Sequence, residues 1–261
     1  MGGFSLEAVI LAAGNGTRLQ NAHSGSKCLV EIGGQPLIER QLRALNQAGC
    51  ARVIVIVGYD ADRVRTAVGS AAECVVNTRW GETNSLYSFL LACPHVEGDL
   101  LVLNCDVLFP PPLLHSLAAI QSSAIAYDST SSPDEDQMSV AVENGRVVEL
   151  GKLMSRERVS GENLGVVHLT RSAAADAFEA AGSVVKGGRL REWFASALNP
   201  IATDHHLAAF NVAGMPWSEI DSPVDLDRAR QSVWPAIQDW RRRFAGFDDQ
   251  PWPLSAADAG F

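Results

Sequence analysis

Near its N-terminus the chain joins a short apolar strand to a glycine-rich loop that carries positive charge. Residues Ala8–Ala12 read AVILA, an uninterrupted apolar run typical of a strand buried on both faces of a parallel sheet. Gly14 and Gly16 follow at once, and Arg18 and Lys27 come next. Ligands of open α/β sheets bind where strands end, and glycines let backbone N–H groups approach a phosphate closely. The segment predicts an anion site at a sheet edge. The alternative is a tight turn with surface cations.

Strand and helix patterns alternate through the first half of the chain. Apolar runs and turn residues predict strands at 28–32, 53–57, 73–76, 100–103 and 124–127 and helices at 36–48, 60–68, 84–91 and 112–120. Short links between such elements favour right-handed crossovers. We therefore expect an α/β fold with a Rossmann-like, doubly wound, mostly parallel sheet flanked by helices.

The pattern changes after about residue 128. Asn144-Gly145 lies between two alternating runs and predicts a β-hairpin over 138–150. Further strands are expected at 163–168, 207–210 and 217–220, and helices at 171–181, 189–198 and from Asp221 to about 244. We expect one integrated domain with an α/β portion over 1–128, a smaller β-rich portion over 129–230, and a C-terminal helix and tail over 231–261.

Composition excludes several classes of protein. The 261 residues are 47% hydrophobic and carry a net charge of −9, so a broad nucleic-acid or anionic-membrane surface is not expected. Local positive charge in one cleft can still bind a small anion. No run approaches the roughly 18 apolar residues of a membrane helix, and no secretory signal is evident. The five scattered cysteines contain no C-x-x-C pair and predict reduced thiols in a cytoplasmic protein.

The loop differs from the common nucleotide motifs, having neither a third Rossmann glycine nor a Walker GK[ST]. Its string LAAGNGTRL, with Lys27 nine residues after Arg18, resembles the signature of the sugar-nucleotidyltransferase (pyrophosphorylase) superfamily. The strings KCLVEIGGQPLIERQL (27–42), GY (58–59), N-x-x-W-x-x-TNS-x-x-S (77–88) and GE-x-x-G (161–165) make it most similar to the phosphocholine cytidylyltransferase-like branch. That branch includes cytidylyltransferases for inositol phosphate and aminoalkylphosphonates. Cys28 departs from the proline that much of the superfamily has.

The resemblance implies a Mg²⁺-dependent cytidylyltransferase that uses CTP and a small phosphate or phosphonate acceptor and releases pyrophosphate. Phosphocholine, aminoethylphosphonate and inositol phosphate are the expected acceptors. Two alternatives remain: a sugar-1-phosphate nucleotidyltransferase using UTP, GTP or dTTP, and a non-catalytic nucleotide-binding regulatory module. The portion over 1–128 would bind the nucleotide, and the portion over 129–230 would bind the acceptor. No nucleic-acid partner or membrane insertion is expected, and the 129–200 region with the last helix is a candidate homodimer surface.

Phosphoryl-group chemistry of this kind relies on positioning and charge. The resemblance implies that Arg18 stabilises the β- and γ-phosphates and that Lys27 neutralises the α-phosphate. It also implies a set of nucleotide-binding residues: Leu11, Ala12, Ala13, Gly14, Gly16, Thr17, Asn84 and Ser85. Asn84 has the alternative role of capping the helix that follows it.

A metal cation is expected at the same sheet edge. Asp106 closes the run LLVLNCD, and Asp221 follows the run WSEI. Mg²⁺ takes one or two protein carboxylates together with water and phosphate oxygens. The matching aspartates of the resembled family coordinate Mg²⁺, which implies that role for Asp106 and Asp221. The alternatives are a turn or N-cap role for Asp106 and the N-cap of the last helix for Asp221.

The acceptor is expected to contact the second half of the chain. The resemblance implies acceptor-binding roles for Lys152 and Glu162, and the alternative for Lys152 is a surface lysine. Asp128, which closes the run AIAYD, is a further candidate for binding the acceptor. A quaternary ammonium acceptor would favour an aromatic cage. The candidate cage residues are Trp80, Tyr87, Tyr127, Trp193 and Trp217.

Overall fold

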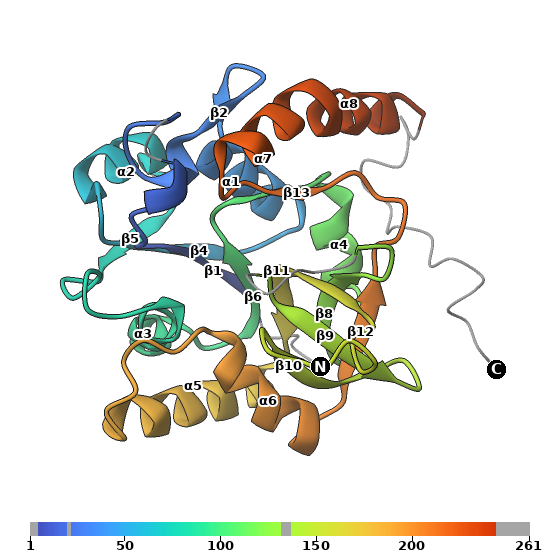
Figure 1. The fold of residues 1–261 in the computed structure, drawn as a ribbon. Helices are drawn as coiled ribbons and strands as arrows, with labels where there is room; N and C mark the ends of the chain where they lie inside the picture. Colours follow the sequence, from blue (N-terminus) through green and yellow to red (C-terminus); the bar gives the residue numbers. More distant parts are fainter. Residues whose placement is uncertain (1–4, 20–21, 132–136, 244–261) are drawn as a thin grey trace.

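A single nine-stranded sheet organises the chain in the computed structural model, which describes residues 5–19, 22–131 and 137–243 (Figure 1). Its strand order is β5-β4-β1-β6-β11-β8-β12-β10-β9. In chain order these strands are β1 (Leu6–Ala12), β4 (Arg52–Val57), β5 (Glu73–Val76), β6 (Asp99–Asn104), β8 (Ser123–Asp128), β9 (Ser139–Glu143), β10 (Arg146–Gly151), β11 (Gly161–Leu169) and β12 (Leu207–Asn211).

Two short antiparallel strand pairs lie outside this sheet. They are β2 (Glu31–Ile32) with β3 (Gln35–Pro36), and β7 (Val107–Leu108) with β13 (Ser218–Glu219). The α-helices are α1 (Leu37–Gln47), α2 (Ala61–Val68), α3 (Ser85–Leu91), α4 (Pro112–Ala118), α5 (Arg171–Lys186), α6 (Ala195–Asp204), α7 (Pro223–Arg228) and α8 (Trp234–Arg243). Among the described residues, no helix combines the length and the apolar content that a membrane crossing needs.

The first half of the sheet is parallel, as the buried apolar runs predict. β4, β1 and β6 lie side by side in register, with Leu11 opposite both Ile56 and Asn104. The Gly14–Gly16 loop and Asp106 therefore follow strands that end at the same edge. This edge is where ligands of open parallel sheets bind.

An antiparallel strand joins the two halves of the sheet. β11 pairs with β6 along one side and with β8 along the other. β8 and β12 are again parallel to each other, and the β9–β10 hairpin forms the far edge. These pairings mean that β11 and β10 run opposite to the other strands. All of these strands belong to one sheet, so the portion over 129–230 continues the sheet of the first portion.

Helices cover both faces, and strand alternation decides which residues face which layer. Along β1, Ile10 packs in the apolar layer beneath α1, α2 and α4, whereas Leu11 packs in the layer above α3, α5 and α6 (Figure 1). In the second layer Phe89 stacks on Phe178 with ring centroids 4.3 Å apart. Aromatic stacking thus joins α3 to α5, and both helices bury one apolar face.

Three predicted elements differ from the structure: the strand at 28–32, the helix at 189–198 and the C-terminal helix. Lys27–Leu29 forms a 3₁₀ turn, and only Glu31–Ile32 of the expected strand 28–32 is extended. This pair bonds to β3 instead of to the central sheet, because Gly33 and Gly34 reverse the chain with positive φ angles of 57° and 74°. The helix expected at 189–198 begins only at Ala195.

The expected C-terminal helix is interrupted. It consists of α7, a π-helical turn over Ala229–Val233, and α8. The part of the predicted tail beyond residue 243 lies outside the described residues.

Candidate active site

A cleft of about 480 Å³ opens at the edge where β1 and β6 end. The glycine loop and residues 77–88 line one side, and residues from the second half of the chain line the other. Lining residues from that second side include Met138, Lys152, Asn163, Arg191 and Trp193. Both halves of the sheet thus contribute to one continuous hollow of a size suited to small-molecule ligands.

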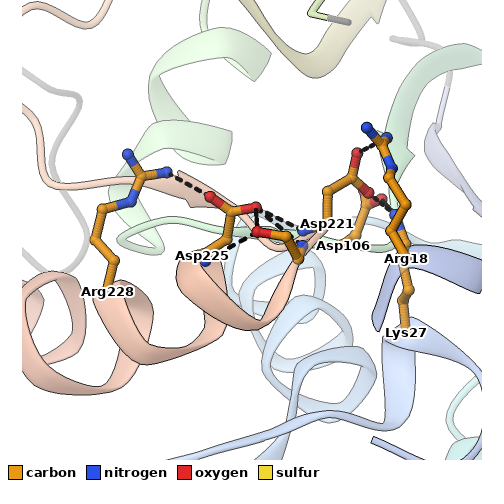
Figure 2. Close-up of polar contacts among 7 residues, drawn as sticks. Arg18, Lys27, Asp106, Asp221, Asp225 and Arg228 are labelled. Carbon is orange, nitrogen blue, oxygen red and sulfur yellow. Dashed lines mark hydrogen bonds and ion pairs between the residues drawn. The ribbon is translucent and has the colours of Figure 1, made fainter. Parts of the chain in front are cut away.

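Two cations and two aspartates meet on the floor of the cleft (Figure 2). The Nζ atom of Lys27 lies 3.2 Å from Oδ2 of Asp106, and Lys27 also forms an ion pair with Asp221. The guanidinium of Arg18 donates to the other carboxylate oxygen of Asp221. The side chains of Lys27 and Asp106 are each 15% exposed, so water screens their attraction less than at an open surface. The structure therefore brings together four residues that the sequence predicts at this site.

A third carboxylate, which the sequence analysis does not predict, completes the acidic group. Asp106, Glu219 and Asp221 offer ligand oxygens that all lie within 4.8 Å of one another. Glu219 lies on β13 opposite Val107, and this short pairing brings it to the Asp106 turn. The only sequence signal for it is the spacing in EID, since residues two apart on a strand point to the same face.

The electrostatic environment of Glu219 disfavours its charged form. Burial, followed by the negative charge of Asp106, raises the pKa of Glu219 to about 7, and Lys27 acts in the opposite direction. A cation placed among these oxygens would relieve the repulsion. The donor set of three carboxylates is the hard-oxygen kind that Mg²⁺ prefers.

Asp221 does not cap helix α7. The N-cap of α7 is Ser222, whose hydroxyl and backbone exchange hydrogen bonds with Asp225 in a capping box. Figure 2 shows Asp225 turned toward Arg228 while Asp221 faces Lys27 and Arg18. The capping alternative for Asp221 is therefore wrong, and its carboxylate belongs to the cleft.

The glycine loop is shaped around Lys27. Gly16 has φ = 55°, and a Cβ atom at this position would lie 2.5 Å from Cγ of Lys27. Gly14 has no atom within 4 Å of the corresponding position, so its surroundings are open. Gly16 therefore allows the lysine stem to pass beneath the loop. Leu11, Ala13, Gly14, Gly16 and Thr17 all line the cleft, as the sequence predicts.

Ala12 is the exception among the predicted loop residues. It is fully buried and packs in the layer beneath α1 and α2, on the opposite face of the strand from Leu11. Because side chains alternate along a strand, only one of these neighbours can face the cleft.

Asn77 organises the 77–88 loop, which lines the cleft together with the glycine loop. Its Nδ2 donates to the hydroxyls of Thr83 at 3.0 Å and Ser88 at 3.2 Å, and its Oδ1 accepts from the backbone N–H of Arg79 at 2.9 Å. It is 1% exposed. This residue fixes the 77–88 loop from within, and its place at the start of the N-x-x-W string was the available signal.

The predicted nucleotide contacts Asn84 and Ser85 line the cleft, but the protein already engages their polar atoms. Oδ1 of Asn84 accepts from the backbone N–H of Ser85 at 2.8 Å, so Asn84 is the N-cap of α3. The hydroxyl of Ser85 accepts from the backbone N–H of Phe194 at 2.9 Å.

Only one of the three predicted acceptor residues lines the cleft. Lys152 does so, with its Nζ 4.2 Å from the ring centroid of Trp193. Asp128 instead accepts from Trp217 Nε1 at 2.8 Å and from Thr130, which places its carboxylate beside a turn. Glu162 is buried and accepts from Ser131.

Of the five aromatic residues considered for a cation cage, Trp80 and Trp193 line the cleft. Tyr127 is buried, and Trp217 bonds to Asp128. Trp80 packs edge-on against Tyr59, and the face of Trp193 already carries the Lys152 ammonium. Among the described residues, the predicted aromatics thus do not converge on one point of the cleft.

The cysteines are all thiols. Cys28 and Cys105 are buried and hydrogen-bonded to each other, next in sequence to Lys27 and Asp106. Hydrogen bonding from Cys105 lowers the pKa of Cys28 and, together with burial, raises that of Cys105.

Comparison with known proteins identifies relatives in sequence and in structure. The family profile described as the MobA-like NTP transferase domain matches residues 8–204. The bifunctional IPC transferase and DIPP synthase of Rubrobacter xylanophilus is 30% identical over 240 residues, which are 87% of this chain and 51% of that protein. The CTP:phosphoglutamine cytidylyltransferase of Campylobacter jejuni is 27% identical over 166 residues, 56% of this chain and 66% of that protein.

The first of these relatives is about twice the length that this chain spans. Among solved structures, the inositol-1-phosphate CTP transferase from T. maritima superposes with a TM-score of 0.74 and 23% identity. The superposition covers 92% of this chain and 98% of that one. It confirms the predicted α/β fold with a central sheet flanked by helices.

Proposed function

The chain belongs to the MobA-like NTP transferase domain family, and from that membership we propose that it transfers CMP from CTP to a small phosphate or phosphonate monoester and releases pyrophosphate. The observation that carries this proposal is the pair formed by Lys27 and Asp106 beneath the glycine loop. A phosphate-binding loop, two cations and an acidic group on one cleft floor fit the needs of nucleotidyl transfer.

The reaction forms one phosphorus–oxygen bond and breaks another. An oxygen of the acceptor phosphate attacks the α-phosphorus of CTP, and the bond from the α-phosphorus to the bridging oxygen of pyrophosphate breaks. Negative charge grows on the α-phosphate oxygens and on the leaving pyrophosphate. In this proposal Lys27 neutralises the first, and Arg18, which also lines the cleft, neutralises the second.

The nucleotide lies along the glycine loop in this proposal. The backbone and side chains of Leu11, Ala13, Gly14, Gly16 and Thr17 border it, and the 77–88 loop held by Asn77 faces it. Backbone N–H groups of such a loop need no side-chain reorganisation to meet a phosphate. The geometry of the cleft supports this position of the nucleotide. We propose CTP as the nucleotide because two of the relatives above carry CTP in their names.

The acidic group fits a magnesium ion. Asp106, Glu219 and Asp221 would hold Mg²⁺, because their oxygens lie within 4.8 Å of one another and Glu219 is disfavoured as a free anion. Bound Mg²⁺ supplies charge neutralisation for the phosphate oxygens. Lys27 and Arg18 orient the same carboxylates from the side of the glycine loop.

The acceptor occupies the second half of the cleft, with Lys152 as the cation that meets its phosphate. Inositol phosphate, phosphocholine and aminoethylphosphonate are the acceptors that we propose to test first. Asp128 and Glu162 are not included, since their carboxylates bond to neighbouring side chains.

A substrate panel tests the proposal. Pyrophosphate release is measured with CTP, UTP, GTP and dTTP, each against the three acceptors and against glucose 1-phosphate. We expect release with CTP and one of the three acceptors, and loss of that release in Asp106→Ala. Turnover only with a sugar 1-phosphate and another nucleotide would replace this proposal with the sugar-nucleotidyltransferase alternative. CTP binding without turnover across the panel would favour a regulatory module.

A further inference from the structure

The first turn of α3 holds a distant segment of the chain in a defined position. The backbone N–H of Asn84 donates to the carbonyl of Leu190 at 3.1 Å, and that of Leu86 donates to the carbonyl of Glu192 at 3.2 Å. These bonds replace the intrahelical partners that the first N–H groups of a helix lack. Residues 190–194 are consequently neither helix nor strand, although their sequence predicts the start of a helix.

Two side chains add to this backbone pairing. Oγ of Ser85 accepts from the N–H of Phe194 at 2.9 Å, and Nδ2 of Asn84 donates to the carbonyl of Arg191 at 3.4 Å. Both side chains are half-buried. Four hydrogen bonds therefore join the N-cap and the first two residues of α3 to the 190–194 segment, and the polar atoms of Asn84 and Ser85 serve this junction.

The docked segment presents large side chains to the acceptor half of the cleft. Arg191, Trp193 and Phe194 all line it. Trp193 is 44% exposed, and the ammonium of Lys152 lies 4.2 Å from the centroid of its ring. A cation over an indole face is an attractive arrangement. The Lys152 ammonium and the Trp193 ring thus lie next to each other in the cleft.

We infer that Asn84 and Ser85 are positioning residues for the acceptor: they hold 190–194 so that Arg191, Trp193 and Lys152 form one recognition surface. The inference rests on the proposed function for the identity of the two substrates. It reassigns two residues that sequence reasoning places at the nucleotide. Their loss alters the acceptor side of the cleft and leaves the glycine loop, Lys27 and Asp106 untouched.

Kinetics separate this role from a nucleotide contact. In Ser85→Ala the N–H of Phe194 loses its partner, so the segment loosens and ground-state binding of the acceptor weakens. We expect the acceptor KM to rise about tenfold with the KM for CTP unchanged. Ser85→Thr keeps the hydroxyl and is expected to restore the acceptor KM.

A second variant isolates the other side chain. Asn84→Asp keeps an oxygen that caps α3 and loses the N–H that reaches the carbonyl of Arg191. We expect the same selective rise in acceptor KM. The control is Ser172→Ala, in the first turn of α5, whose hydroxyl contacts Thr170 at 3.3 Å outside the cleft. Neither KM should change in that variant.

Hydrogen exchange supplies a readout that needs no turnover. Peptides spanning 190–194 are expected to exchange faster in Ser85→Ala than in the wild type and in Ser85→Thr, as measured by mass spectrometry. Unchanged exchange overturns the inference, and so does a raised KM for CTP with an unchanged acceptor KM. If the wild type turns over none of inositol 1-phosphate, phosphocholine and aminoethylphosphonate, the proposed function fails, and faster exchange in Ser85→Ala still supports the docking role.

Discussion

The ammonium nitrogen of Lys27 lies 3.2 Å from Oδ2 of Asp106, although 79 residues separate them in the sequence. Lys27 also contacts Asp221, so one lysine neutralises carboxylates from two distant parts of the chain. Gly16 leaves room for the stem of the same lysine, so the side chain of Lys27 connects the glycine loop to the acidic group.

Removing the lysine should abolish most of the activity. We expect Lys27→Ala to lower kcat/KM by at least about 100-fold, the scale of losing one charged group from the transition state. The measurement is pyrophosphate release with CTP and the acceptor found in the panel. The control is Lys186→Ala at the exposed end of α5. Equal rates in the two variants would remove Lys27 from the mechanism.

The glycine loop offers a sterically matched pair of variants. Gly16→Ala places a Cβ atom 2.5 Å from Cγ of Lys27 and requires a left-handed φ of 55°, so the lysine must move. We expect at least about a tenfold loss in kcat/KM from this displacement. Gly14→Ala adds the same methyl group in open space, and its loss should be smaller. A larger loss in Gly14→Ala would contradict the proposed fit between the loop and Lys27.

Magnesium should bind to the folded protein without substrate. We expect Mg²⁺ to raise the midpoint of thermal unfolding of the wild type, because a ligand that binds only the folded state adds about 2.7 kcal/mol at 100 times its Kd. Asp221→Asn and Glu219→Gln should each reduce this shift. Asp62→Asn, whose side chain is 99% exposed, is the charge-matched control. A full shift in Glu219→Gln would exclude the residue from the ion site.

His168 should make the protein less stable in mild acid. Burial lowers the pKa of His168 below 6.5, while the ring bonds to the carbonyl of Ser122 at 3.1 Å. Below pH 6.5 the unfolded chain binds a proton that the folded protein does not, so stability falls as pH falls toward the lowered pKa. Urea midpoints at pH 7.5 and 5.5 measure this loss. It should shrink in His168→Gln and persist in the control His206→Gln, an exposed site. A loss of the same size in His168→Gln would assign the pH dependence to another group.

The parallel half of the sheet follows from local sequence. β4 contains the whole run 53–57 that its apolar pattern predicts, and these five residues are all buried, because a strand buried between layers needs a continuous apolar run and little else. Residues 28–32 have a similar pattern but form a 3₁₀ turn and a two-residue strand. Their conformation depends on the reversal at Gly33-Gly34, which apolar periodicity does not encode.

The floor of the site was predictable for a related reason. Asp106 follows β6, and parallel neighbours end at one edge, so the sequence places it beside the glycine loop. Glu219 was not predicted because its strand has only two residues, and its position near Asp106 depends on the pairing with Val107. The docking of 190–194 on Asn84 depends on contacts across 107 residues, and no local pattern signals it.

The antiparallel strand β11 separates the parallel strands β5, β4, β1 and β6 from β8, β12, β10 and β9. The proposed phosphate chemistry lies at the ends of central strands, whereas Lys152 follows β10, the strand next to the edge, and Trp193 belongs to an irregular segment. Substitutions in peripheral segments are tolerated more readily than those in a packed sheet. We therefore expect substitutions near Lys152 and Trp193 to change the proposed acceptor preference without altering the residues at the ends of the central strands.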